Sequence, residues 1–232
     1  MNVADAKGRR WDAATGIGFA VLAVIALGLP GAPPKADDSI VKIGRYFADK
    51  DSKILAGNLL LAVAGVLFLW FLGSVRSYLR AAEGGEGRLS AASFGGGVLG
   101  IAMTLAGAAL FNGIAFKLTD TSGVGPDVVR AVFDAASAVL AMAGVGFAVF
   151  IGAASCSAAR SGALAPWLYW SGSVIALLQL LGTIALVAKS GFFATGGAMT
   201  LIAPLTALIW IVAVSVVIMQ RDGVPPVPRT EP

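Results

Sequence analysis

The sequence has no histidine and only one cysteine among its 232 residues. Without histidine, the chain lacks the commonest general base, metal ligand and pH-sensing side chain of proteins. The single thiol, Cys156, forms neither an internal disulfide nor a thiolate metal cage, so we interpret it as a small packing residue near the end of a hydrophobic segment. These absences argue against a hydrolase or a metal enzyme. We therefore expect no catalytic residues, no cofactor and no metal site.

Charged residues are also scarce. They make up 13% of the chain, about half the share that is usual in a soluble domain, whereas 57% of the residues are hydrophobic. A soluble fold of this size could not bury that much apolar surface, so we expect lipid to surround most side chains. The net charge is +4, but the basic residues flank hydrophobic runs and do not alternate with aromatic residues. They predict an orientation in a membrane and not a nucleic-acid partner.

Long hydrophobic runs dominate the chain, and Ile54–Val75 is free of charge over its whole length. As a helix this run spans about 33 Å, close to the apolar thickness of a bilayer. The sequence predicts an all-α bundle of six transmembrane helices within residues 1–219, followed by a disordered, proline-rich tail at 220–232. The expected spans are about 11–30, 54–75, 94–116, 128–158, 167–188 and 198–219. Pro204 predicts a modest kink in the last of them.

The first span follows a short basic segment and resembles a secretory signal peptide in this respect. Asp5, Asp12 and the lack of a small-x-small cleavage site favour a helix that is retained.

The connection at 31–53 is the most polar one between spans. Asp37 or Asp38 is placed to cap a short helix that continues to about Lys50. Apolar residues recur on one face of this segment at helical spacing, at Ile40, Ile43 and Phe47. The pattern predicts an amphipathic helix that lies on the membrane surface or over the bundle, with a binding lid or a docking helix as the alternative.

Glycines cluster in Ala81–Gly97, but the segment lacks the GxxxxGK[ST] pattern and no strand precedes it, which excludes a phosphate-binding loop. Gly96 and Gly100 form a GxxxG pair instead, and this pair predicts a close approach between two helices.

An even number of spans places both termini on one side of the membrane. Basic residues number nine on that side and eight on the other, so their count does not decide the orientation. The basic segment before the first span favours cytoplasmic termini in the cell (inner) membrane. Four tryptophans are expected to form a belt at the interface on the side of the termini: Trp11, Trp70, Trp167 and Trp170.

Polar and small side chains form stripes within the expected spans. The stripes are Asn58 with Ala62 and Gly65; Gly100, Thr104, Ala108 and Asn112; Asp134, Ser137, Ala141, Gly144 and Ala148; and Gln179 with Thr183. We expect them to face one another in the bundle interior, because small residues let helices approach and polar ones bond across.

The candidate intramembrane polar positions are Asn58, Asn112, Arg130, Asp134 and Gln179. Arg130 lies one turn before Asp134, so the two charges are expected to pair. The stripes then serve as structural cross-links between helices. In that case Asp134→Asn is expected to lower the stability of the fold without altering any transport across the membrane. The alternative is a polar pathway or a small-molecule cavity.

Three segments carry a resemblance to a known family: IVKIGRYFADK (40–50), LFLWFLGSVRSYLR (67–80) and EGGEGRLSAASFGGG (83–97). Over about residues 30–115 the chain resembles uncharacterised six-span bacterial integral membrane proteins that share a domain of unknown function. The resemblance implies a six-span helical fold in the cell membrane. It implies no activity and assigns no site residues.

Two functions stay open. The first is a non-catalytic role in which the protein binds membrane lipid, a small ligand, another membrane protein or a second copy of itself. The second is a small-molecule transporter or channel with a polar interior between spans 2–5, although the two halves of the chain show no clear repeat. An intramembrane enzyme is disfavoured, because the spans contain no paired acids and no GxSxG motif.

Overall fold

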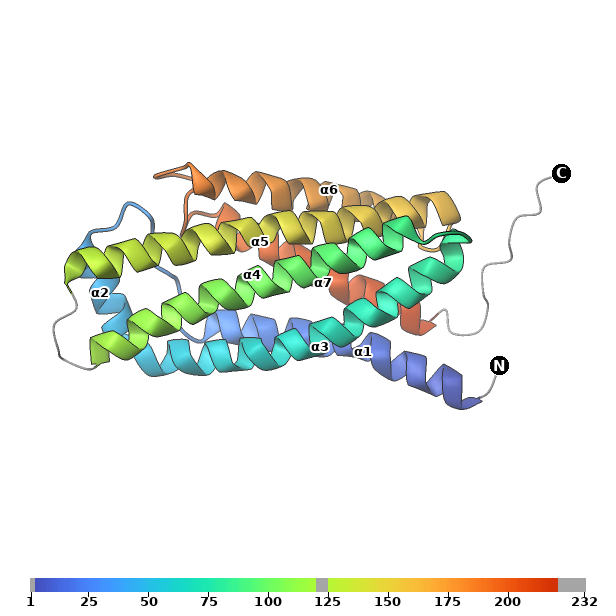
Figure 1. Ribbon diagram of the computed structural model, residues 1–232, viewed down its shortest axis with the longest axis horizontal. Helices are drawn as coiled ribbons and strands as arrows, with labels where there is room; N and C mark the ends of the chain where they lie inside the picture. The colour runs from blue at the N-terminus through green and yellow to red at the C-terminus, as the bar shows by residue number, and fades with distance from the viewer. Residues whose placement is uncertain (1–2, 120–124, 221–232) are drawn as a thin grey trace.

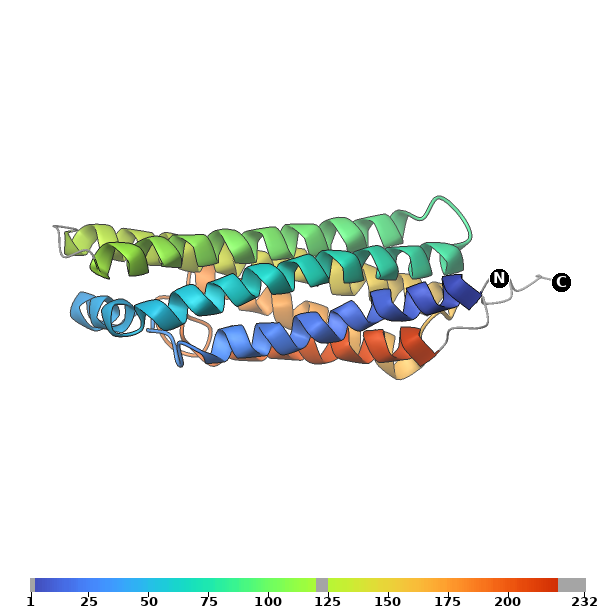
Figure 2. The ribbon, with the colours of Figure 1, turned by 90° about the horizontal axis from the view of Figure 1, so that it is seen from below.

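Six long helices run side by side in one elongated bundle, and a short helix covers one end of it (Figures 1 and 2). The computed structural model describes residues 3–119 and 125–220, and within them the side chains of 14–116 and 125–220. The elements are α1 (Val3–Gly28), α2 (Ile40–Asp49), α3 (Asp51–Glu83), α4 (Arg88–Thr119), α5 (Pro126–Ser161), α6 (Pro166–Gly182), the 3₁₀ helix η1 (Thr183–Leu186) and α7 (Met199–Gln220). The expected all-α bundle is therefore confirmed, with no strand in the described part of the chain.

The long helices form a closed ring in which neighbours follow the order of the sequence. Each packs along the next one, from α3 through α4, α5 and α6 to α7, and α1 closes the ring by packing on both α3 and α7 (Figure 2). The start of α1 and the end of α7 lie at one end of the bundle, which we call the terminal end. The opposite end carries α2, and we call it the α2 end.

Among the described residues, the number of candidate spans differs from the expected six. Five helical segments are long and apolar enough to cross a membrane: α3, Arg88–Phe116 of α4, α5, α6 with η1, and α7. Among the described side chains, α1 contributes only the shorter apolar stretch Ala14–Gly28. At 1.5 Å per residue this stretch covers about 22 Å, less than the apolar thickness of a bilayer. The α1 backbone nevertheless runs along the bundle from the terminal end toward the α2 end, where it stops short of the ends of α4 and α5 (Figure 1).

The amphipathic helix is confirmed as α2, with Ile43 and Phe47 buried against the bundle. Its expected cap is wrong. Ser39 is the N-cap, and its Oγ accepts from the backbone N of Lys42 at 3.4 Å. Asp38 instead accepts from the backbone N of Lys35 at 2.8 Å and from Lys42 Nζ at 2.7 Å. A cap residue needs an extended backbone, and Ser39 has it, with φ −64° and ψ 149°.

Besides a small cluster of Ala26, Leu61 and Ala108, two larger apolar clusters fill the bundle at different levels. The larger one occupies the terminal half, where the rings of Phe68 and Phe150 meet edge to face at 5.7 Å and Phe150 meets Trp210 at 5.8 Å. The smaller one lies under α2 and contains Phe47 and Phe133. The candidate site borders the larger of these two clusters.

The expected close approach at the GxxxG pair is confirmed between α4 and α5. A Cβ atom at Gly96 would lie 2.6 Å from the backbone N of Phe150, and one on Gly146 of α5 would overlap the backbone of Gly100. Pro204 lies inside α7, as expected. Cys156 is exposed on α5, so its interpretation as a packing residue is wrong.

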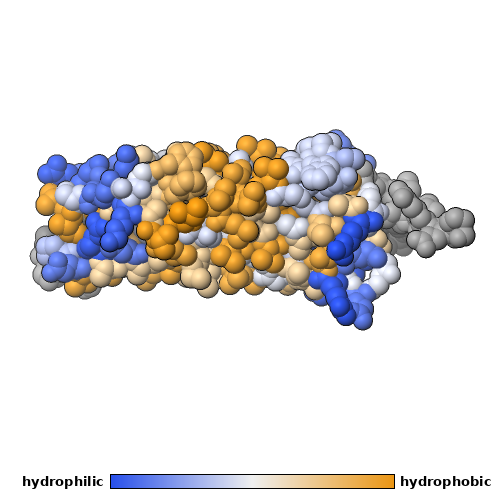
Figure 3. Space-filling view, turned by 90° about the horizontal axis from the view of Figure 1, so that it is seen from above, coloured by the Kyte–Doolittle hydropathy of each residue, from blue (hydrophilic) through white to orange (hydrophobic). Residues whose placement is uncertain are grey.

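The surface is divided into zones. Apolar residues fill the middle of the face seen in Figure 3, and hydrophilic residues gather at both ends. Trp70, Trp167 and Trp170 are exposed on the parts of α3 and α6 that lie nearer the terminal end. The side chain of Trp11, and the tail after Gln220, lie outside the described residues. The zones match the pattern of a protein that spans a membrane several times.

Candidate functional site

A cavity of about 240 Å³ lies inside the ring, and residues of the largest apolar cluster, such as Phe19 and Ile211, border it. Every long helix contributes to its wall, and so do η1 and the turn before α7. Apolar side chains form most of the wall, including Phe19 and Leu27 of α1, Leu140 of α5 and Leu208 of α7. The polar side chains of the wall are Thr104, Ser137, Gln179, Thr195 and Thr200.

Small residues explain why the ring is hollow at this level. Ala23, Ala141, Gly144, Ala203 and Ala207 face the space that phenylalanine and tryptophan rings fill nearer the terminal end. Six helices in a ring enclose a centre that only large side chains fill, so a run of small ones leaves a gap.

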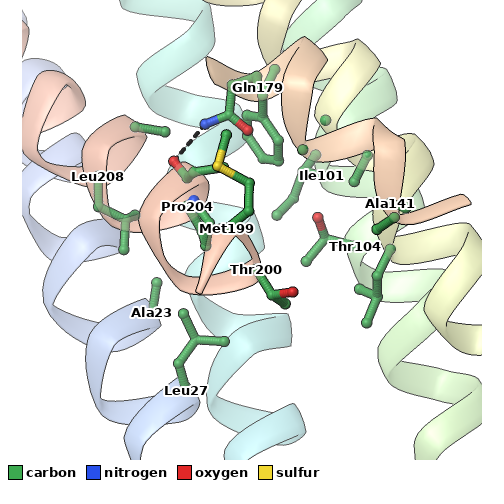
Figure 4. A pocket seen from close by; sticks show the side chains of 18 of the residues that line it. Ala23, Leu27, Ile101, Thr104, Ala141, Gln179, Met199, Thr200, Pro204 and Leu208 are labelled. Atoms are coloured by element: carbon green, nitrogen blue, oxygen red, sulfur yellow. Dashed lines mark hydrogen bonds between the residues drawn. The ribbon is translucent and has the colours of Figure 1, made fainter. Parts of the chain in front are cut away.

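Gln179 is the polar side chain held most firmly at this cavity. It is 4% exposed, and its Nε2 donates to the backbone O of Ala203 at 2.6 Å, which links α6 to α7 (Figure 4). That carbonyl can only accept, so the amide orientation is fixed with Oε1 on the other side. Oε1 accepts no hydrogen bond from any residue that the structure describes. In Figure 4 it points toward the space between α7 and Ile101 of α4.

Two of the hydroxyl groups in the wall donate to carbonyls of their own helices, and that of Thr200 donates to the backbone O of Ala194 at 3.3 Å. Thr104 Oγ1 donates to the backbone O of Gly100 at 2.9 Å, and Ser137 Oγ donates to that of Phe133 at 2.8 Å. Each hydroxyl has one hydrogen, so both groups keep only acceptor capacity toward the cavity.

The stripes of α5 and α6 face one another as expected. A Cβ atom on Gly144 would lie 2.8 Å from the backbone O of Gln179 and 3.4 Å from Thr183 Cγ2. Gly144 thereby lets α6 lie close to α5 where Gln179 enters the wall.

Asn58 and Asn112 meet each other outside the cavity wall. Asn58 Nδ2 donates to Asn112 Oδ1 at 2.7 Å and to the backbone O of Ala108 at 3.1 Å, which links α3 to α4. The expected bonding across these two stripes is confirmed. Neither asparagine contributes to the wall.

Arg130 and Asp134 form the expected pair, with 2.9 Å between Nε and Oδ2. Arg130 also donates to the backbone O of Ala36 at 2.6 Å and of Asp38 at 3.2 Å. It therefore fastens the connection between α1 and α2 to α5. Neither residue lies in the cavity wall, and the Asp134 side chain is 53% exposed.

The structure thus brings only Gln179 of the five candidate positions to the cavity. Sequence reasoning placed the interior between spans 2–5 and missed the contribution of α1 and α7. For α7 the available signal was Pro204, a proline inside an apolar segment.

The wall has little capacity for acid–base or metal chemistry. Its residues carry no charged side chain, and the described part of the chain holds no group of three or more His, Cys, Asp or Glu placed to bind a metal ion. What the arrangement provides is an apolar space with hydrogen-bond acceptors, suited to a neutral molecule.

Comparison of the chain with protein-family models, with curated proteins and with solved structures found no match.

Proposed function

We propose that this chain is a non-catalytic, multi-pass membrane protein that binds a small, largely apolar molecule inside its helix bundle. The cavity of about 240 Å³, with wall residues from all six long helices, carries this proposal. An apolar cavity of about 150 Å³ holds a benzene molecule, so this one offers room for about ten non-hydrogen atoms.

The exposure of two wall residues supports entry of a ligand into the cavity from the surrounding membrane. Leu27 and Thr200 line the cavity and are exposed at the outside of the bundle, at the end of α1 and the start of α7. A molecule dissolved in lipid would reach the interior there without crossing a polar barrier. An empty cavity would forfeit the van der Waals contacts of its wall, which favours an occupied state.

A transporter or channel with a polar interior between spans 2–5 has weaker support. Asn58 and Asn112 bond to each other, Arg130 pairs with Asp134, and none of the four lies in the cavity wall. A polar pathway requires such groups to face a shared space.

We place the protein in the cell (inner) membrane of a bacterium with cytoplasmic termini, as a member of the six-span family that it resembles. Arg76, Arg80, Arg88 and Arg160 lie toward the terminal end, near the exposed tryptophans. Reporters fused at residue 50 and at residue 232 test this orientation. An inside signal at 50 with an outside signal at 232 would reverse it.

Filling the cavity tests the binding function. In Ala141→Phe the ring enters the space that the ligand would occupy (Figure 4). Ala102→Phe places the same ring on the exposed side of the neighbouring helix α4 and serves as the control.

The measurement is thermal unfolding of delipidated protein in micelles, with and without decane. A ligand at 100 times its dissociation constant stabilises the folded state by about 2.7 kcal/mol. We expect decane to raise the midpoint of the wild type and of Ala102→Phe, and to leave that of Ala141→Phe unchanged. Equal shifts in all three proteins would refute binding at this cavity.

A further inference from the structure

We infer that the ligand of this cavity is a neutral long-chain alcohol that enters head first and donates its hydroxyl hydrogen to Gln179 Oε1. The inference rests on the proposed function and adds the chemical class and the orientation of the ligand.

The first reason is the unpartnered acceptor that the buried side chain of Gln179 carries. Gln179 is 4% exposed, Nε2 is committed to the backbone O of Ala203, and Oε1 has no partner among the described residues. Oε1 itself is not fully buried, since it faces the cavity, and an acceptor that faces an apolar space without a hydrogen bond is costly. A ligand that donates a hydrogen bond to Oε1 removes this cost.

The neighbouring polar groups point to the same class. Thr104 and Ser137 donate to carbonyls of their own helices and offer only lone pairs to the cavity. These two hydroxyl groups therefore supply acceptors and no free donor to the cavity. A hydroxyl head matches it, whereas an ether or ester head, which only accepts, does not.

The lack of charge in the wall excludes ionised heads. No arginine, lysine, aspartate or glutamate is among the wall residues that the structure describes. A carboxylate, phosphate or ammonium group would lose its hydration there without gaining an opposite charge. The head must therefore be neutral.

The positions of the wall residues determine the orientation of the ligand in the cavity. In Figure 4, Gln179 lies at one end of the group and Leu27 at the other. Leu27 is 47% exposed, so that end borders the outside of the bundle. A head at Gln179 leaves the apolar chain directed toward Leu27 and the surrounding lipid.

Hydrophobicity alone cannot select this ligand, because lipid tails are as apolar as the cavity wall. Selection must come from the hydrogen bond. A hydrogen bond between neutral groups that gives a partner to an acceptor in an apolar cavity corresponds to about a tenfold change in affinity.

The experiment uses two photoreactive derivatives of decan-1-ol with the full chain in lipid nanodiscs. One carries a diazirine next to the hydroxyl, the other at the far end of the chain, and mass spectrometry locates the labelled residues. We expect the first to label α6 and α7 around Gln179 and Ala203, and the second to label around Leu27 and Thr200. The reverse pattern would overturn the inference.

Competition against the first probe isolates the hydrogen bond. Unlabelled decan-1-ol and its methyl ether differ only in the donor, and the ratio of their potencies is measured in each protein. We expect Gln179→Met to lower the preference for the alcohol about tenfold while the two compounds still compete. Thr206→Val, which removes the other side-chain donor to the backbone O of Ala203, is the control and keeps the wild-type ratio.

The outcomes separate the two proposals. The inference fails if Gln179→Met leaves the ratio unchanged or if Thr206→Val changes it equally, yet the cavity still binds apolar molecules. The proposed function fails as well if neither probe labels the wall, or if Ala141→Phe labels like the wild type. Should Gln179→Met not fold, the labelling positions in the wild type decide the orientation by themselves.

Discussion

Replacing Gly96 by alanine is expected to destabilise the bundle strongly, although the change adds only one methyl group. The added Cβ atom would lie 2.6 Å from the backbone N of Phe150 and 2.9 Å from the backbone O of Gly146. These are backbone atoms of α5, so no side chain can rotate out of the way. The first distance is about 0.8 Å shorter than the 3.4 Å at which ordinary contact begins. Helices α4 and α5 must therefore separate by a similar amount.

The cost follows from two terms. Overpacking of a well-packed interface costs about 1–3 kcal/mol. Separation also stretches the hydrogen bond from Ser93 Oγ to the backbone O of Phe150, now 3.0 Å, and such bonds between membrane helices contribute about 0.6 kcal/mol. We expect Gly96→Ala to lose about 2–4 kcal/mol of unfolding free energy.

The neighbouring residue provides a matched control. A Cβ atom on Gly95 would meet no atom within 4 Å, so Gly95→Ala removes a helix-weakening glycine at no steric cost. That change is expected to be neutral or to stabilise by up to about 1 kcal/mol. The assay is reversible unfolding in mixed micelles, followed by the helical signal. Equal stabilities for the two variants would refute the close approach of α4 and α5.

Three further results are expected. In a double-mutant cycle, Asn58→Leu and Asn112→Leu should show a coupling of about 0.6 kcal/mol, and additive losses would contradict the bond between them. Arg130→Ala should speed amide hydrogen exchange in the connection between α1 and α2, because it removes two hydrogen bonds to backbone carbonyls there. Unchanged exchange would show that other contacts hold this connection. Hydrogen bonds from the Lys42 side chain, and then from the Lys35 backbone N, lower the pKa of Asp38 below its usual 3.8. A lowered pKa of Asp38 stabilises the folded state at pH values above 3.8. The protection of α2 amides against hydrogen exchange should therefore decline as the pH falls through the folded-state pKa. Asp38→Asn should abolish this pH dependence.

Local patterns in the sequence were sufficient to predict the helices and several of their contacts. The spacing of Ile43 and Phe47 defines one face of α2 wherever that helix lies, and the spacing of Gly96 and Gly100 marks a surface on which another backbone can rest. The cap of α2 was wrong by one residue, because Asp38 and Ser39 are equally suited to cap and only the backbone decides between them.

The cavity could not be predicted in the same way. It exists because α1 closes the ring against α7, so that Ala23 and Ala203 face a common space although they are far apart in the sequence. Hydropathy identifies a helix as buried in lipid, but it does not say which helices are neighbours. Gln179 was a candidate because it is polar within an apolar segment, while its partner, a backbone carbonyl of α7, has no sequence signature.

Arg130 shows a similar limit. Its spacing from Asp134 predicted their ion pair, which forms. Its bonds to the carbonyls of Ala36 and Asp38 give it a second role, because they hold the connection that leads into α2. Contacts of a side chain with the backbone of a distant segment leave no pattern in the sequence.

Native mass spectrometry of the protein, extracted gently from its own membrane, tests most directly whether the cavity holds a ligand. We expect the wild-type chain to carry one neutral small molecule of defined mass and the Ala141→Phe variant to lack it. A wild-type chain without any bound molecule, or one that retains the same molecule after the cavity is filled, would contradict binding inside the bundle.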